Sequence, residues 1–194
     1  NVIDLPGTYS LSVRSPDEEI ARDVLLGRAL DTPKPDIVVC VVDAGNLERN
    51  LYLVTQIQDL GVPIIIALNM MDEAEHQGRD INIKKLSQHL GVPVIATVAN
   101  QNKGIEELKQ LIAEGVSVEY DRGWRMAPDL EEEIDRLTKL LGQHKDVGPY
   151  EAFSESLTFL SQSKMSDSSY FSRRSYPKET MAEISVVHER LQKK

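Results

Sequence analysis

Short, continuous apolar runs alternate with helical patterns through the first part of the chain. The clearest runs are residues 37–42, 63–68 and 93–97, and they are rich in β-branched side chains. Continuous apolar runs are typical of strands that are covered on both faces, as in parallel sheets. Val2 and Ile3 fit the end of a further buried strand. Strands that alternate with helices over short connections predict a doubly wound α/β domain.

Helical patterns between these runs begin and end at recognisable signals. Ser15 and Glu18 have the spacing of a capping box, and Pro16 suits the first helical position. A glycine follows three of the four patterns, and glycine is a common helix stop. The predicted helices are residues 17–29, 47–60, 83–90 and 105–114.

The pattern changes after Gly115, where no further continuous apolar run occurs. Apolar side chains at helical spacing predict helices instead, and a serine-rich stretch at 161–175 is typical of a loop. We therefore expect a partial α/β domain over residues 1–118 and an all-helical appendage over residues 119–194. The predicted helices of the appendage are residues 129–141, 150–160 and 179–191.

Composition and charge narrow the class of protein. The chain has 194 residues, 31 of them acidic and 22 basic, and a formal net charge of −9. Nucleic-acid binding needs clustered Lys and Arg, so we expect no nucleic-acid partner. The single cysteine, Cys40, cannot form an internal disulfide, which fits a reducing compartment. Because no stretch approaches the roughly 18–20 apolar residues of a membrane helix, these residues are expected to be soluble.

Asp4 and Gly7 form an Asp-x-x-Gly motif directly after the first apolar residues. Such a carboxylate can hold Mg²⁺ through a water, and the glycine lets a backbone N–H approach a terminal phosphate closely. The same residue types are ordinary turn formers. Taken alone, the motif therefore favours a turn over a nucleotide site.

Asn69 and Asp72 form an Asn-x-x-Asp motif after the run at 63–68. An aspartate can accept hydrogen bonds from both N1–H and the exocyclic amine of guanine, a pair of donors that adenine lacks. Asn69 would tie neighbouring loops together. Met70 stands where the usual motif has Lys, although its thioether can still pack on a base. The alternative is that Asp72 only caps a helix.

A third loop, residues 98–100, follows the run at 93–97 and could offer a backbone N–H to the guanine carbonyl. The three motifs occur in the order Asp-x-x-Gly, Asn-x-x-Asp and third loop, and each follows an apolar strand. They would therefore share the carboxyl edge of one sheet, where α/β folds bind ligands. This order is the layout of a GTPase.

Four segments carry a closer resemblance, namely Asp4–Leu11, Ser15–Glu18, Asn46–Leu53 and Ala67–Asp72. Over roughly residues 1–115 the sequence resembles the cytosolic GTPase domain of the ferrous iron transport protein B (FeoB) family. The resemblance implies an α/β, P-loop-NTPase-like fold of the Ras type with a mostly parallel sheet. It also implies that the all-helical appendage corresponds to a small domain that favours GDP binding.

The resemblance implies roles for individual residues toward GTP or GDP and Mg²⁺. Asp4 would hold Mg²⁺ through a water, and Gly7 would contact the γ-phosphate. Thr8 stands where Ras-like GTPases have Gln, so hydrolysis by a Gln-positioned water is not available. The second switch loop would include Thr8, Tyr9 and Ser10. The guanine site would consist of Asn69, Met70, Asp72, Val98, Ala99 and Asn100.

The phosphate loop Gly-x-x-x-x-Gly-Lys-Ser/Thr does not occur in these residues. In the family it lies upstream, so we expect an N-terminally truncated domain with weak nucleotide binding and no useful catalysis. The missing strand would leave a slot beside the run at 37–42, where unpaired backbone groups are costly. In the parent protein, GTP binding and hydrolysis would regulate Fe²⁺ uptake at the cytoplasmic face of the inner membrane. Its partners would be the transporter's membrane domain and other Feo proteins.

Two alternatives stay open at this point. The chain could be a degenerate, non-catalytic interaction module that kept the scaffold without the phosphate loop. It could also be a soluble GTPase of the ribosome-assembly type, which shares both motifs. The segment Asn46–Leu53 and the acidic charge argue against that second alternative.

Overall fold

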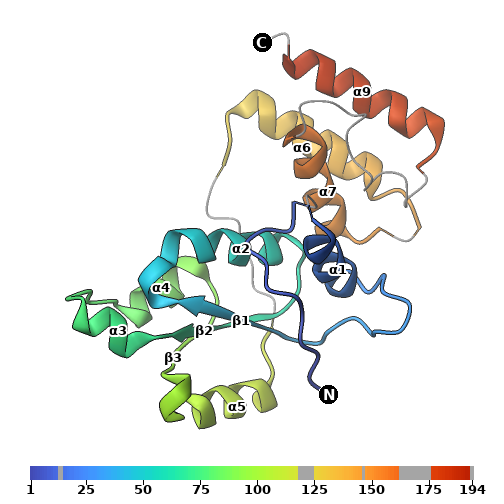
Figure 1. Ribbon diagram of the computed structural model, residues 1–194. Helices are drawn as coiled ribbons and strands as arrows, with labels where there is room; N and C mark the ends of the chain where they lie inside the picture. The colour runs from blue at the N-terminus through green and yellow to red at the C-terminus, as the bar shows by residue number, and fades with distance from the viewer. Residues whose placement is uncertain (13–14, 118–124, 146, 162–175, 193–194) are drawn as a thin grey trace. The chain divides into compact units, whose positions relative to one another are not determined.

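The computed structural model describes residues 1–12, 15–117, 125–145, 147–161 and 176–192 (Figure 1). The chain forms two compact units, Asn1–Asp121 and Arg122–Lys194.

The first unit is built on a parallel sheet of three strands, in the order β1-β2-β3. The strands are β1 (Val38–Asp43), β2 (Ile64–Asn69) and β3 (Val94–Ala96). The prediction of a parallel sheet from the three apolar runs is therefore confirmed. All three strands point the same way, so the loops that follow them lie along one edge.

Helices flank this sheet, and Figure 1 shows α2 and α5 on opposite sides of it. The capping box of α1 is confirmed, because Ser15 Oγ accepts from the Glu18 N–H and the Glu18 side chain accepts from the Ser15 N–H. The helices are α1 (Pro16–Leu25), α2 (Leu47–Asp59), α3 (Met71–His76), α4 (Ile83–Leu90) and α5 (Ile105–Glu114), with 3₁₀ turns at η1 (Ala44–Asn46) and η2 (Ala99–Gln101). Helix α1 ends earlier than predicted, shortly before Gly27 with a φ of +71°.

The two faces of β1 differ. Cys40 and Val42 lie in the main core, whereas Val39 and Val41 are 36% and 64% exposed. The expectation that this strand is covered on both faces is therefore wrong. The reason is the covering layer. The core that contains Cys40 and Val42 also contains Val54 and Ile57 of α2, whereas the described elements cover the face of Val39 and Val41 less completely. Apolar composition alone does not distinguish these two environments.

The prediction of a buried strand at Val2 and Ile3 is also wrong. Neither residue lies in a strand, and their exposed fractions are 100% and 42%. A strand needs a neighbour that accepts its ladder of hydrogen bonds. In the described sheet, Val2 and Ile3 pair with none of the three strands.

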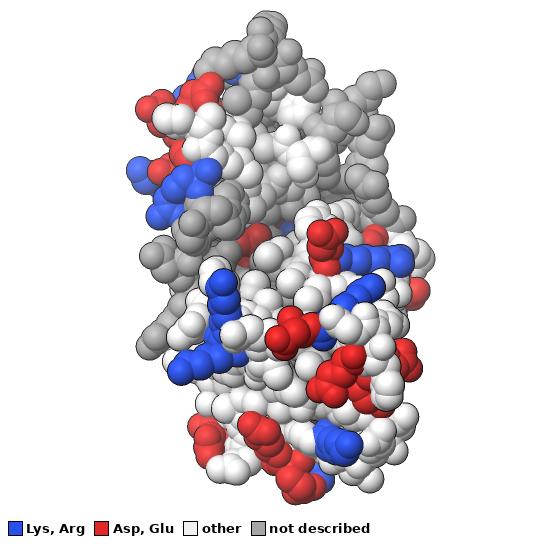
Figure 2. Space-filling model, turned by 90° about the vertical axis from the view of Figure 1, so that its left-hand side faces the viewer, with Lys and Arg blue, Asp and Glu red and all other residues white. Residues whose placement is uncertain are grey.

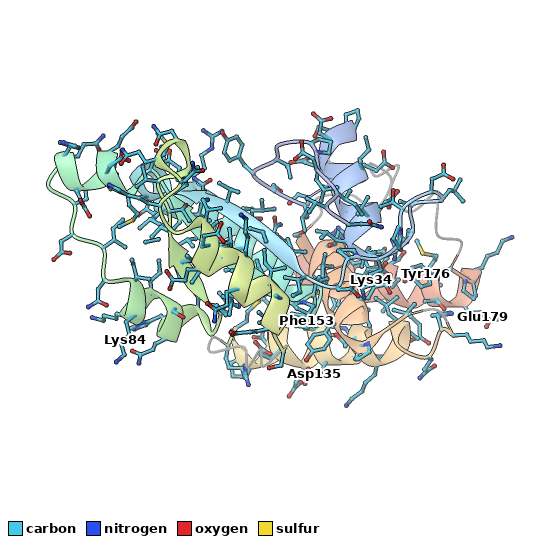
Figure 3. All side chains as sticks on the ribbon, turned by 90° about the horizontal axis from the view of Figure 1, so that it is seen from below. Lys34, Lys84, Asp135, Phe153, Tyr176 and Glu179 are labelled. Atoms are coloured by element: carbon cyan, nitrogen blue, oxygen red, sulfur yellow. The ribbon has the colours of Figure 1, made fainter. Side chains whose placement is uncertain are left out.

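The second unit is helical in its described residues and has its own core. Its helices are α6 (Pro128–Leu141), α7 (Pro149–Ser161) and α9 (Lys178–Gln192). Core side chains include Leu137, Phe159 and Ile184, and the Tyr176 hydroxyl donates to the buried carboxylate of Glu155. Figure 3 labels Tyr176 in this unit. Of the serine-rich stretch predicted as a loop at 161–175, Ser161 is the last residue of α7, and residues 162–175 lie outside the described residues.

Burial gives Cys40 a testable pH dependence. Desolvation of the thiolate raises the pKa of the Cys40 thiol from 9.0 to about 11. The unfolded thiol ionises first, so this contribution to stability is complete below pH 9 and is lost as the pH rises from 9 toward 11. The loss amounts to about 2 to 3 kcal/mol.

The measurement is urea unfolding of the wild-type chain and of Cys40→Ala at pH 8.5 and at pH 10.5. Titration of Lys and Tyr affects both proteins equally, so the difference isolates the thiol. We expect the wild type to lose more free energy of unfolding than the variant over this interval. Equal losses would contradict a buried thiol.

Candidate guanine-recognition site

The loops that follow the strands meet at the carboxyl edge of the sheet. Asp43 at the end of β1 pairs in register with Asn69 at the end of β2. Leu68 pairs with Ala96, so the loop after β3 begins beside Asn69. The parallel register thus places side chains from distant parts of the sequence along one edge, as the motif order predicts.

Asn69 joins the loops after β2 and β3. Its Oδ1 accepts a hydrogen bond from the backbone N–H of Ala99 at 3.1 Å. Thr97 Oγ1 lies 3.3 Å from both Asn69 Oδ1 and the Leu68 carbonyl, which share its one hydroxyl hydrogen. Thr97 is 3% exposed, whereas Ala99 is exposed. One amide oxygen therefore fixes the start of the third loop relative to the Asn-x-x-Asp loop.

Asp72 lies in the first turn of α3, and its carboxylate is partly exposed. Oδ2 accepts from Gln101 Nε2 at 3.1 Å, and Oδ1 accepts from the Glu73 N–H at 3.0 Å. The N-cap position belongs to Met70, whose side chain makes no capping bond. The alternative that Asp72 serves as the helix N-cap is therefore wrong.

Met70 adopts a left-handed backbone with a φ of 62°. Such a conformation is uncommon for a residue other than glycine and is often found where function constrains the backbone. It occurs at the position where the usual motif has Lys. The turn directs the chain from β2 into α3 and so sets the place of Asp72.

The third loop is closed by a short bridge. Val98 and Lys103 pair antiparallel through backbone hydrogen bonds of 3.1 and 3.3 Å, and Val98 is buried. Ala99 and Asn100 lie in η2 and are exposed at the edge of the sheet. Gly104 then turns the chain back with a φ of +76°, and a Cβ there would lie 2.0 Å from the Ala96 carbonyl oxygen.

Replacing Asn69 by alanine tests this connection. The Ala99 N–H would lose its acceptor, and a hydrogen bond of this kind contributes about 1 kcal/mol. We expect amide exchange at Ala99 to become faster, while the Val98–Lys103 bridge keeps its protection. Asn69→Asp is the matched control, because it keeps the Oδ1 acceptor. Unchanged exchange in Asn69→Ala would show that Asn69 does not hold the third loop.

Four contacts at this edge were not predicted from the sequence. Gln101 reaches Asp72, and Asp43 accepts from the Gly45 N–H at 2.7 Å and from Asn46 Nδ2 at 2.6 Å. Arg79 Nη1 donates to the Gly45 carbonyl and connects this loop to the end of α3. The resemblance to the FeoB family included the segment Asn46–Leu53 in this region, but no residue spacing in the sequence predicted these contacts.

Asp4 and Gly7 are exposed in the described structure, and nothing lies within 4 Å of a Cβ built on Gly7. The turn after them is held locally, since Thr8 Oγ1 donates to the Ser10 carbonyl at 2.7 Å and accepts from the Ser10 N–H at 3.2 Å. Among the described residues, the hydrogen bonds at Asn69 and Asp72 join α3 to the third loop and do not reach Asp4 or Gly7. The structure thus brings together the residues that were predicted for base recognition, but not all predicted site residues.

Charged side chains of both signs lie on the surface of the described residues (Figure 2). On the face in Figure 2, acidic and basic side chains are interspersed among the coloured residues. Lys84 extends away from α4 (Figure 3).

Within the described ranges no cluster of three or more His, Cys, Asp or Glu side chains could hold a metal. No described helix combines the length and apolar character needed to cross a bilayer.

A parallel sheet whose Asn-x-x-Asp loop is tied to the loop after the next strand has the architecture of a GTPase G-domain. Comparison with known proteins makes the class specific. The family described as "Ferrous iron transport protein B" matches residues 1–112, and the chain belongs to this family. This membership excludes the ribosome-assembly type of GTPase.

Curated relatives extend the match. The Fe(2+) transporter FeoB of Escherichia coli (strain K12) is 44% identical over 144 residues, which are 72% of this chain and 18% of the relative. A fusion protein of Fe(2+) transport protein A and Fe(2+) transporter FeoB from Porphyromonas gingivalis is 48% identical over 107 residues, 55% of this chain and 12% of that one. The chain therefore spans less than a fifth of the length of either relative.

Solved structures agree with this assignment. NFeoB from S. thermophilus bound to GDP, AlF₄⁻ and K⁺ superimposes with a TM-score of 0.79 at 37% identity, over 96% of this chain and 69% of that one. The cytosolic domain of L. pneumophila FeoB gives a TM-score of 0.71 at 35% identity, over 81% and 65% of the two chains.

Proposed function

We propose that this chain binds guanine nucleotides through the group formed by Asn69, Asp72 and Ala99. The observation that carries the proposal is the hydrogen bond from the Ala99 N–H to Asn69 Oδ1 at the sheet edge. It holds the exposed Ala99 beside the loop that carries the partly accessible carboxylate of Asp72. That carboxylate can accept from the N1–H and the amine of guanine, and the Ala99 N–H would turn from Asn69 Oδ1 to the guanine carbonyl when the base binds. The similar NFeoB structure bound to GDP supports the same ligand class.

Met70, Val98 and Asn100 complete the proposed base site. Met70 would pack its thioether chain on the base in place of the usual Lys stem. Val98 is buried and supports the loop from below, while Asn100 is exposed in η2. Asp72 and Ala99 would thus recognise the edge of guanine, and the Met70 side chain would pack on the face of the base.

The phosphate end of the nucleotide would involve the Asp-x-x-Gly segment. Asp4 is an exposed carboxylate, and hard cations such as Mg²⁺ prefer oxygen ligands. A single carboxylate fits a water-mediated partner of the ion and not a complete set of protein ligands. Gly7 leaves room for a phosphate to approach its N–H. Thr8, Tyr9 and Ser10 would form the start of the loop that responds to the γ-phosphate.

In the whole transporter, we propose that GTP binding and hydrolysis in this domain regulate Fe²⁺ uptake across the membrane. The domain would act at the cytoplasmic face on the transporter's membrane domain, with other Feo proteins as further partners. The helical unit, predicted as residues 119–194, would act like a GDP-dissociation inhibitor. Family membership supports this assignment.

The test is a titration of the ¹⁵N-labelled chain, first with GDP and then with ADP. Guanine recognition predicts saturable shifts of the Asn69 side-chain amide and the Ala99 backbone amide with GDP, and at least tenfold weaker binding of ADP. Equal affinity for both nucleotides, or no binding of either, would contradict the proposal. No binding would instead favour the non-catalytic interaction module.

A further inference from the structure

The loop that follows Asp-x-x-Gly is held against α2 by side chains whose role the family match does not assign. Figure 1 shows the segment before α1 running beside α2. Arg49 and Gln56, which lie on one face of α2, contact this loop. Tyr52 lies between them on that face and accepts from Gln56 Nε2.

Arg49 stacks on Tyr9. Its Cζ lies 3.7 Å from the centroid of the Tyr9 ring, within the range of a cation–π contact. Tyr9 is 52% exposed, so the ring has no other extensive packing that fixes it. An exposed pair of this kind changes an equilibrium by about two- to fivefold. The contact is strong enough to bias a loop and weak enough to open.

Gln56 holds the next part of the loop. Its Oε1 accepts from the Leu11 N–H at 2.8 Å, and its Nε2 lies 3.3 Å from both Ser12 Oγ and the Tyr52 hydroxyl. Leu11 is 4% exposed and belongs to the main core, and its carbonyl accepts from Arg22 Nη1 at 3.3 Å. Leu11 is thus a fixed point, and the segment before it can move about this anchor.

In this arrangement Thr8 is turned inward. Its hydroxyl donates a hydrogen bond to the Ser10 carbonyl, and the Ser10 N–H donates one to Thr8 Oγ1. These groups therefore satisfy one another and are not directed at a ligand. A loop with its polar groups used internally and its tyrosine stacked on α2 fits a resting conformation.

We propose that Arg49 and Gln56 are positioning residues that hold the Gly7–Ser12 loop in this resting conformation. The stacking of Arg49 on Tyr9 is the part that opens when a terminal phosphate recruits Gly7. The proposal rests on the proposed function, because it assumes that this loop faces the phosphates. By linkage, weakening the contact raises the affinity for a ligand that needs the open loop. It does not change the affinity for a ligand that binds without opening the loop.

The first measurement is hydrogen exchange of the ligand-free chain over residues 7–12. Arg49→Met keeps the length of the side chain without its guanidinium, and Tyr9→Leu removes the ring. We expect about two- to fivefold faster exchange in both variants, and wild-type exchange in Tyr9→Phe, which keeps the ring. Exchange in β2 should stay unchanged. If Tyr9→Phe behaves like Tyr9→Leu, or if Arg49→Met has no effect, the proposed contact is wrong.

The second measurement compares a non-hydrolysable GTP analogue with GDP in the wild type, Arg49→Met and Arg49→Lys. We expect Arg49→Met to bind the analogue two- to fivefold more tightly with GDP affinity unchanged, and Arg49→Lys to lie between. Equal losses for both ligands would indicate a merely structural role and overturn the proposal. A wild-type chain that does not distinguish GDP from ADP would contradict the proposed function, and with it the regulatory role, even where the exchange results hold.

Discussion

Replacement of Gly104 by alanine is expected to destabilise the first unit by about 2 to 5 kcal/mol. Two costs add. An L-residue in the left-handed region costs about 1 to 2 kcal/mol, and Gly104 has a φ of +76°. A Cβ would also lie 2.0 Å from the Ala96 carbonyl oxygen, so the backbone must shift, which costs roughly 1 to 3 kcal/mol. Because Gly104 closes the third loop, the Ala99 N–H would be displaced as well.

Gly78→Ala is the matched control. Gly78 has a nearly equal φ of +72°, but nothing lies within 4 Å of a Cβ built there. It should therefore show the conformational cost alone, about 1 to 2 kcal/mol. The measurement is hydrogen exchange of the β2 amides, which reports the unit that contains both glycines. Equal destabilisation by the two substitutions would show that Gly104 does not approach the Ala96 backbone.

The sheet was predictable because its strands are strongly patterned. The three β-branched runs correspond to β1, β2 and β3, whose ends differ from the predicted ends by one residue. The predicted helix at 105–114 coincides with α5. Parallel strands place their following loops at one edge, so the proximity of Asn69 and Ala99 also follows from the pattern.

Other features depend on neighbours that are distant in sequence. The exposure of Val41 depends on which elements cover that face of β1, which its apolar run does not reveal. The contacts of Gln101 with Asp72 and of Arg49 with Tyr9 join residues that no periodicity relates. The alternative that Asp72 caps a helix is wrong because α3 begins earlier, after a left-handed backbone at Met70.

Replacement of Asp72 by asparagine is expected to exchange guanine preference for xanthine preference. The carboxylate can accept from both N1–H and the exocyclic amine of guanine. An amide keeps one acceptor but turns its NH₂ donor toward that amine, so one hydrogen bond becomes a donor–donor contact. Charge-assisted bonds contribute about 1.5 to 3 kcal/mol, which predicts roughly a hundredfold loss for guanine. Xanthine has a carbonyl at the same position, so it accepts from the new NH₂.

The substitution should change the fold little. Asp72 is partly exposed, and its Oδ1 and Oδ2 accept from the Glu73 N–H and from Gln101 Nε2. The amide oxygen can still accept from the Glu73 N–H, and the exposed Gln101 can rotate its amide so that its Oε1 accepts from the new NH₂. Exchange in β2 should therefore match the wild type. Asp72→Ala is the second control, since it removes the acceptors without adding a donor and should lose guanine preference without gaining xanthine.

The central claim, that Asp72 reads the base of a guanine nucleotide, is tested most directly by the ratio of the Kd values for GDP and XDP. The ratio is measured for the wild-type chain and for Asp72→Asn under the same conditions. The predicted result is tighter binding of GDP by the wild type and tighter binding of XDP by the variant. A ratio that stays the same in both proteins would contradict the assignment of Asp72 to the guanine site.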